Sequence, residues 1–178
     1  MEKKWIIITV IAVAVVAIAA AAAVLMMNGD KEWETSPDKW VLDHSISVGD
    51  WIEFDGTEYE ITGKTGDKYD VRVSKGYSSS YKEMTSKEFL SLLTSKKQLE
   101  AWTDGFDIDY NLKYDSTRDI STEFGTKTCK VYKGTATGSL LGSKITQNLS
   151  LYIGDHGILY RMDTDSGNLY LDSNLSFL

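Results

Sequence analysis

The pattern of apolar and polar positions divides the chain into one long apolar run and a remainder of short alternations. The run covers residues 5–27, and Lys3 and Lys4 precede it. As a helix it would span about 35 Å at ~1.5 Å per residue, which crosses a hydrocarbon core of roughly 30 Å. Because positive residues favour the cytoplasmic side, we predict a single-pass helix with a cytoplasmic N-terminus and an extracytoplasmic C-terminal part. The positions that represent the membrane-spanning segment are Trp5, Ile11, Val16, Ala20 and Met27.

A cleaved signal peptide is the alternative interpretation of the same segment. Ala19–Ala23 offers small residues at which cleavage could occur, and the domain would then be secreted. The run is longer than the usual apolar region of a signal peptide, roughly 7–15 residues, and this favours a retained signal-anchor. The first partner that the sequence predicts is therefore the lipid bilayer.

Alternation after residue 45 predicts strands, and the polar residues 28–45 predict a stalk. Trp51–Phe54 alternates and is followed by Asp55-Gly56, a dipeptide typical of tight hairpin turns. Two further alternating segments, residues 58–62 and 68–73, complete a three-stranded meander.

One amphipathic helix follows the meander. Thr85 and Glu88 have the spacing of a capping box, in which a hydroxyl and a carboxylate satisfy the first backbone N–H groups. Leucines at helical spacing then predict a helix from Ser86 to about Trp102, with a candidate break near Thr94-Ser95.

Alternating segments return in the second half and predict further strands. The Gly-, Ser- and Thr-rich stretch 134–143 predicts a loop among them. The expected strands are residues 106–112, 119–124, 126–133, 145–153, 158–162 and 169–175.

The predicted fold class is α+β. An N-terminal transmembrane helix precedes a mainly antiparallel β domain of about nine strands, with one helix packed on the sheet. The predicted parts are a membrane segment at 1–27, a stalk at 28–45 and a β-rich domain at 46–178, divided into 46–102 and 103–178.

Charge and cysteine content narrow the class of partner. The net charge is −7, and such an acidic chain repels nucleic acid, so we expect no nucleic-acid partner. Cys129 is the single cysteine, which excludes an internal disulfide and is typical of a small buried residue.

Two segments of the second half resemble a known pattern. Gly125–Tyr132 and Leu151–Met162 resemble strand pairs of uncharacterised membrane-anchored surface proteins of methanogenic archaea. Over about residues 117–172 the chain also resembles the antiparallel half-barrel of LolA/LppX-like lipoprotein carriers. That second resemblance implies a concave sheet face that binds acyl chains and no catalytic residue.

Candidate chemical groups in the chain are few. His44 and His156 are the two histidines, too few for a zinc site. Asp163–Asn168 is similar to the start of a calcium loop, but Asn168 and Asn174 stand where that loop needs glycine and glutamate, so we interpret it as a hairpin turn. Nucleophile-elbow, phosphate-loop and dinucleotide motifs are absent from the sequence. We therefore predict a protein that is not an enzyme and has no catalytic residue, metal or cofactor.

Asn148 and Asn174 each begin an N-glycosylation sequon on the side that we expect to be outside. Tyr77–Tyr81 and Leu140-Leu141 are candidate loop contacts for a protein partner. The sequence thus predicts an extracytoplasmic binding or interaction domain of unknown ligand. A structural envelope protein without a ligand site and a hydrophobic-ligand or lipid carrier remain alternatives.

Overall fold

The computed structural model describes residues 31–103, 106–140 and 143–178. The chain divides into two compact units, residues 1–32 and residues 33–178. The expected membrane-spanning positions lie outside the described residues. Within the described ranges, every helix is too short or too polar to cross a bilayer.

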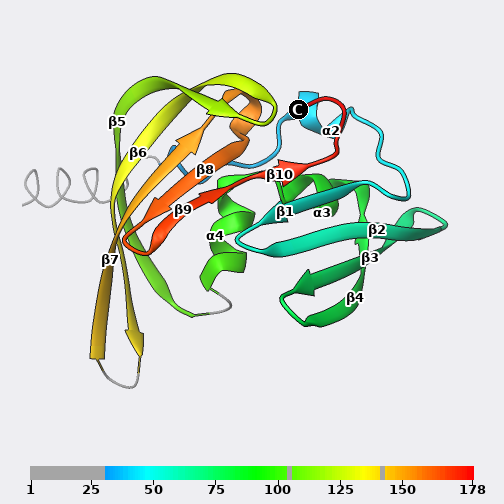
Figure 1. Cartoon of the computed structure of the whole chain (residues 1–178), viewed down its shortest axis with the longest axis horizontal. Helices are drawn as coiled ribbons and strands as arrows, with labels where there is room; N and C mark the ends of the chain where they lie inside the picture. Colours follow the sequence, from blue (N-terminus) through cyan, green and yellow to red (C-terminus); the bar gives the residue numbers. More distant parts are fainter. Residues whose placement is uncertain (1–30, 104–105, 141–142) are drawn as a thin grey trace, which may run out of the picture. The chain divides into compact units, whose positions relative to one another are not determined.

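Residues 33–178 form two five-stranded sheets in which all pairings are antiparallel (Figure 1), and this confirms the expectation of a mainly antiparallel β domain. The first sheet has the strand order β10 (Asp172–Ser173), β1 (Trp51–Phe54), β2 (Thr57–Thr65), β3 (Lys68–Lys75) and β4 (Ser78–Thr85). The second sheet has the order β5 (Ile108–Thr122), β6 (Gly125–Leu140), β7 (Ser143–Ile153), β8 (Leu159–Thr164) and β9 (Gly167–Tyr170).

Short helices connect and flank the sheets. They are α2 (Lys39–Leu42), α3 (Ser86–Ser91), α4 (Ser95–Thr103) and the 3₁₀ turn η1 (Asp155–Gly157). The predicted capping box is confirmed, because the Glu88 N–H donates to the Thr85 hydroxyl and the Glu88 carboxylate accepts from the Thr85 N–H at 2.7 Å. The helix expected from Ser86 to about Trp102 is two helices, and they are separated near Thr94-Ser95, where we expected a candidate break.

The break between α3 and α4 has a cause in the second sheet. The Leu93 carbonyl accepts a hydrogen bond from the Leu159 N–H at 2.8 Å, and Thr94 forms an isolated bridge with Ile158. Backbone groups that pair with a strand cannot also continue a helical ladder. The segment between the helices is thus fastened to the start of β8.

The predicted turn at Asp55-Gly56 is confirmed. Both residues have positive φ, 53° and 64°, as a two-residue hairpin of the I′ type requires. The turn joins β1 to β2 with Phe54 directly opposite Thr57.

Two expected loops are strands in the structure. β4 contains most of the Tyr77–Tyr81 segment, and β6 continues to residue 140 through the stretch 134–143 that we predicted as a loop. Small residues are required within β6, because a Cβ atom on Gly134 would lie 1.8 Å from the Asn111 carbonyl oxygen. The glycine therefore permits close approach of two strands and does not mark a loop.

The second compact unit begins at Trp33, inside the range 28–45 that we expected as a polar stalk. Trp33 and Val41 are buried. The Ser95 hydroxyl donates to the Trp33 carbonyl, and the Thr35 hydroxyl donates to the Gly157 carbonyl at 2.7 Å. We call residues 33–44 the N-terminal arm, and it packs on α4 and η1.

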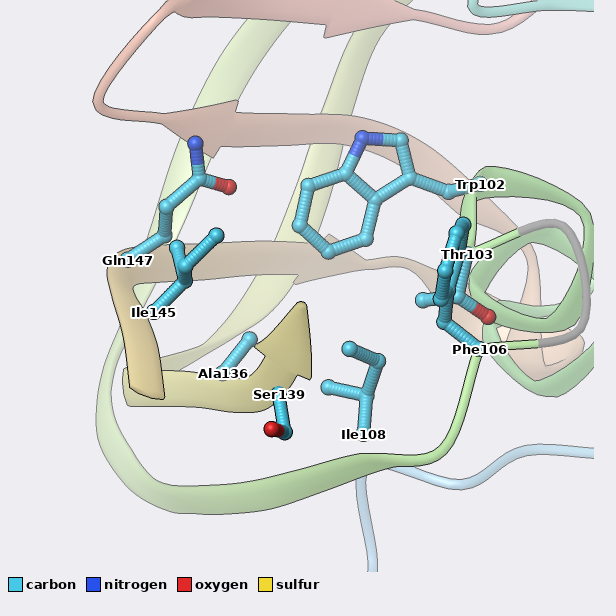
Figure 2. A pocket seen from close by; sticks show the side chains of 9 residues that line it. Trp102, Thr103, Phe106, Ile108, Ala136, Ser139, Ile145 and Gln147 are labelled. Carbon is cyan, nitrogen blue, oxygen red and sulfur yellow. The ribbon is translucent and has the colours of Figure 1, made fainter. Parts of the chain in front are cut away.

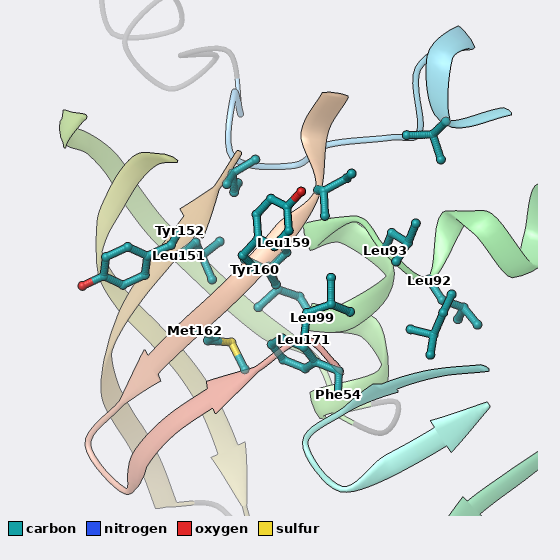
Figure 3. Packing of buried hydrophobic residues seen from close by; sticks show 14 of the residues in the cluster. Phe54, Leu92, Leu93, Leu99, Leu151, Tyr152, Leu159, Tyr160, Met162 and Leu171 are labelled. Carbon is teal, nitrogen blue, oxygen red and sulfur yellow. The ribbon is translucent and has the colours of Figure 1, made fainter. Parts of the chain in front are cut away.

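A single hydrophobic core joins both sheets and the helices (Figure 3). The Leu171 N–H donates to the Tyr160 carbonyl at 3.0 Å, and the next two residues form β10, which pairs with β1 of the other sheet. The C-terminal strand thus links the two sheets. Fully buried members of the core include Ile52, Ile61, Val71, Phe89, Leu90, Leu93, Leu149, Leu151, Leu159 and Met162.

Candidate functional site

A pocket of about 260 Å³ lies where the second sheet meets the end of α4 (Figure 2). We call it the sheet-end pocket. Its lining residues come from α4, the segment that follows it, and strands β5, β6 and β7. They are Trp102, Thr103, Phe106, Ile108, Ala136, Gly138, Ser139, Ile145 and Gln147.

Strand register brings these residues together. Gly138 lies opposite Ile108 on one side and Ile145 on the other, and Ala136 lies opposite Gln147. Residues that are directly opposite in antiparallel strands share a face. Leu149, two residues beyond Gln147 and therefore on that same face, is buried in the core. The sheet-end pocket is thus the part of the core-facing surface that extends past α4.

Small side chains create the space. A Cβ atom on Gly138 would lie 2.4 Å from Cδ1 of Ile108, and the adjacent floor residue is Ala136. Trp102 extends over this floor from the last turn of α4. A larger residue at position 138 would displace Ile108 into the open volume.

The pocket is apolar and partly open to solvent. Phe106 and Ile145 are 58% and 47% exposed, although both are large apolar residues. Thr103, Ser139 and Gln147 supply the polar atoms, and none of the lining residues carries a titratable side chain. Apolar walls with a few polar groups are typical of a ligand site, and without an acid, base or strong nucleophile these walls favour binding over catalysis.

Tyr110 lies on the same face as the sheet-end pocket, opposite Ala136. Desolvation by burial raises the pKa of Tyr110 to about 12, while the Thr103 hydroxyl acts in the opposite direction. The Tyr110 hydroxyl is buried and has no hydrogen-bond partner of normal geometry among the described residues. The phenol is therefore neutral at physiological pH, and its buried hydroxyl lies outside the lining of the pocket.

A second hollow of about 570 Å³ lies between the first sheet and helices α3 and α4. Its rim is charged, but much of that charge is already engaged. The Lys75 Nζ atom lies 3.5 Å from Oδ2 of Asp55, and the Lys97 Nζ atom lies 2.6 Å from Oε2 of Glu100. A ligand here would have to displace existing contacts, so the sheet-end pocket is the better candidate.

Two carboxyl groups share a hydrogen bond at the edge of the first sheet. Burial raises the pKa of Glu123 to about 7, and the hydrogen bond and charge of Asp172, together with the charge of Glu53, add to the shift. Glu53 and Asp172 are directly opposite each other in β1 and β10. Glu123 lies in the turn between β5 and β6, so this carboxyl pair is one of the contacts between the two sheets.

Both histidines of the chain contact Trp40, which sequence reasoning did not predict. The His156 ring stacks on Trp40 with a centroid distance of 4.1 Å, and His44 approaches it edge-on at 4.4 Å. The His156 Nδ1 atom lies 2.7 Å from an Asp38 carboxylate oxygen. Partial desolvation acts to raise the pKa of Asp38. Hydrogen bonds from the Val41 N–H and from His156 outweigh it, so the pKa of Asp38 is lowered below its ordinary value. These contacts hold the N-terminal arm against η1.

The two sequons occupy different settings. The Asn148 side chain and backbone N–H groups both donate to Asp165, at 2.9 and 2.8 Å. Asn174 accepts from the Trp51 N–H at 2.8 Å and donates to the Gly49 carbonyl at 2.9 Å, so its amide connects β1 to the C-terminal segment. Both asparagines are exposed, and glycosylation at either stays a prediction.

Other candidates from the sequence have structural places. Cys129 is fully buried, and desolvation raises the pKa of its thiol to about 11. Asp163–Asn168 forms the hairpin between β8 and β9, as expected. Among the described residues, no group of three or more His, Cys, Asp or Glu side chains is arranged to hold a metal ion.

The sheet-end pocket itself was not predicted from the sequence. Its residues come from four separate elements and from the segment after α4, and those in the elements occur in an ordinary strand or helix pattern. The exposed Phe106 and Ile145 were the available signal, but their exposure depends on where α4 ends. Comparison of the chain with protein families, with curated proteins and with solved structures found no match.

Proposed function

We propose that residues 33–178 form a non-catalytic binding domain that residues 5–27 hold on the outer side of a membrane. The domain binds an apolar ligand, or an apolar group of a partner, in the sheet-end pocket. One observation carries this proposal: the core-facing surface of the second sheet continues past α4 as an open apolar pocket.

Energetic considerations support binding over a purely structural role. Exposed Phe106 and Ile145 side chains cost free energy in water, and covering apolar surface regains roughly 25 cal/mol per Å². The exposed parts of Phe106 and Ile145 are thus apolar surface that an occupant of the pocket would cover. This gain in free energy favours an occupied pocket over an empty one.

The volume and lining indicate the class of ligand. A pocket of 260 Å³ is slightly smaller than the range of about 300–1,000 Å³ that is typical of drug-sized ligands. It suits one aliphatic or aromatic group, with Ser139 or Gln147 available to a polar atom at its end. Its position on the inner face of an antiparallel sheet agrees with the resemblance to half-barrel carriers, and an acyl chain is thus one member of this class.

Native mass spectrometry with lipid extraction tests the proposal. Residues 28–178 contain the complete second unit and would be purified from the natural host. A stoichiometric apolar molecule that co-purifies would support a binding domain. The probe for titration is a fluorescent fatty acid, added to the protein after delipidation.

A matched pair of variants locates the binding site. Ile145→Asp places a charge in the sheet-end pocket, and Val48→Asp places one at a valine that is 59% exposed and does not line it. We expect Ile145→Asp to weaken probe binding at least about tenfold, since an apolar site disfavours an uncompensated carboxylate by more than ~1.4 kcal/mol. Equal weakening by both variants, or no binding by the wild type, would contradict the proposal.

A further inference from the structure

Strand β4 is an edge strand with unusual regularity. Among the described residues it pairs with β3 alone, through consecutive pairs from Lys68–Thr85 to Lys75–Ser78 without a bulge. Its residues 78–83 are exposed, and the single proline of the chain is Pro37. Such an edge presents a row of N–H and C=O groups that a further strand can pair with.

The other long edge, β5, carries features that prevent strand addition. A register shift between Tyr114 and Ser116 interrupts its pairing with β6, and charged residues occur along its length. Bulges and charges are the usual protection of exposed edges. β4 has no bulge, and Lys82 and Glu83 are its only charged residues. The two long edges, β4 and β5, therefore differ in how far they are protected against strand addition.

Hydrogen bonds elsewhere in the sheet show which residues of β4 face outward. The Ile61 N–H donates to Asp50, and the Ile61 carbonyl accepts from Gly49, so the Ile61 backbone points away from β3. Its partner Val71 must then bond to Lys82 in β4. Because direction alternates along a strand, the groups of Ser79, Tyr81 and Glu83 point to the free edge.

We propose that β4 pairs antiparallel with β4 of a second copy of this chain, around a two-fold axis at Tyr81. In such a pair, residues whose backbone groups point outward must lie opposite outward residues of the second copy. Because outward and inward residues alternate, the two-fold axis passes through a residue and not between two residues. An axis at Lys82 would place two ammonium groups opposite each other, and an axis at Glu83 would place two carboxylates opposite each other. Both arrangements are destabilising. An axis at Ser80 would overlap fewer residues of β4.

The axis at Tyr81 leaves no like charges opposite each other. Lys82 then faces Ser80 of the second copy, and Glu83 faces Ser79. The two Tyr81 side chains, each 70% exposed in the single chain, lie side by side on one sheet face. The first sheets of the two copies become one continuous sheet. This inference concerns a different surface from the sheet-end pocket and does not depend on ligand binding.

A pair of single strands buries less than the roughly 800 Å² per partner of a standard interface. The association is therefore weak and concentration-dependent, and a test must detect the register directly. Site-specific crosslinking does so, and it also separates this contact from any association through residues 1–30.

Cysteine substitution in the full chain in detergent provides the test. Opposite Cα atoms of a hydrogen-bonded pair lie about 5.5 Å apart, within the disulfide range of about 4.4–6.8 Å. We expect Tyr81→Cys to form a crosslinked dimer on oxidation or with a short thiol-bridging reagent. Ser79→Cys is the matched control, because its two copies are separated by on the order of 13 Å along the strands. The wild type is the negative control, because its cysteine, Cys129, is buried.

Two further results check the register. A mixture of Ser79→Cys and Glu83→Cys proteins should crosslink as a heterodimer, because these residues are opposite. Adding Tyr81→Pro to both proteins should abolish that crosslink, since proline removes an outward donor and leaves the bonds to β3 intact. Equal crosslinking of Tyr81→Cys and Ser79→Cys, no crosslink in either, or a heterodimer that survives Tyr81→Pro would overturn the proposal.

Discussion

At the scale of single residues, the proton shared by Glu123 and Asp172 makes stability depend on pH. The pKa of Glu123 is raised from its ordinary value of 4.5 to about 7, so the folded chain holds this proton more tightly than the unfolded chain. The resulting stabilisation is complete below pH 4.5 and is lost as pH rises through about 7. Above pH 7 the two carboxylates repel each other between the sheets.

We therefore predict that Glu123→Gln melts at a higher temperature than the wild type at pH 8 and loses this advantage at pH 5. Glutamine retains the hydrogen bond to Asp172 without the charge. Thermal unfolding at the two pH values measures the effect. Asp109→Asn, which removes one charge from β5 far from this turn in the sequence, is the control. An equal gain for both variants at pH 8 would show that net charge, and not this pair, is responsible.

Leu93 is the residue at which helix, strand and core meet. It is fully buried, and its carbonyl accepts from Leu159 of β8. Leu93→Ala should lower the free energy of unfolding by about 2–5 kcal/mol, because it leaves a cavity in the core. Val48→Ala, at an exposed position, should change it by less than about 0.5 kcal/mol. Chemical denaturation measures both, and similar values for the two would contradict the assigned core.

At the scale of elements, the short helix α3 depends on its N-cap residue, Thr85. The Thr85 hydroxyl accepts from the Glu88 N–H, and the hydrogen bonds from Thr85 lower the pKa of Glu88. Thr85→Ala should cost about 1 kcal/mol of unfolding free energy, as the loss of an N-cap usually does. Thr85→Ser keeps the hydroxyl and should retain most of the stability in the same denaturation experiment.

The Glu88 part of this cap has its own pH dependence. Because its pKa is lowered in the folded state, the stabilisation is present above its ordinary pKa of 4.5 and is lost as pH falls through the lower folded value. The difference in melting temperature between wild type and Glu88→Gln should therefore shrink on acidification below pH 4.5. A difference that stays constant down to pH 2 would contradict the role of the carboxylate.

The elements that could be predicted from the sequence are those that depend on interactions between residues close together in the chain. The Asp55-Gly56 turn and the Thr85–Glu88 cap depend on residues within a few positions of each other, and both are present as expected. β4 was not predicted because its serine-rich sequence has no alternation of apolar and polar residues. It is a strand because its backbone pairs with β3. β6 was missed beyond residue 133 because Gly134 and Gly138 are typical of loops, whereas here they allow neighbouring strands to approach.

At the scale of the whole domain, the sheet-end pocket depends on distances that no short window of sequence contains. It exists because β6 and β7 continue past the end of α4. The end of the helix was predicted within a residue, at about Trp102 against Thr103, but the continuation of β6 beyond residue 133 was not. Ala136 and Ile145 have ordinary strand surroundings in the sequence. Only strand register places them on one face, beside Trp102 of the helix.

The pairing of β1 with β10 also has a consequence for the order of folding. Ile52 and Ser173 are partners, although most of the domain lies between them in sequence. During synthesis β2, β3 and β4 can pair as they emerge, but the outer edge of β1 stays open until Asp172 and Ser173 are made. Contacts between distant parts of a chain slow folding and expose strand edges meanwhile. A chaperone that binds extended apolar segments would thus find β1 available longest, and a nascent chain that stops short of Asp172 would be released with that edge uncovered.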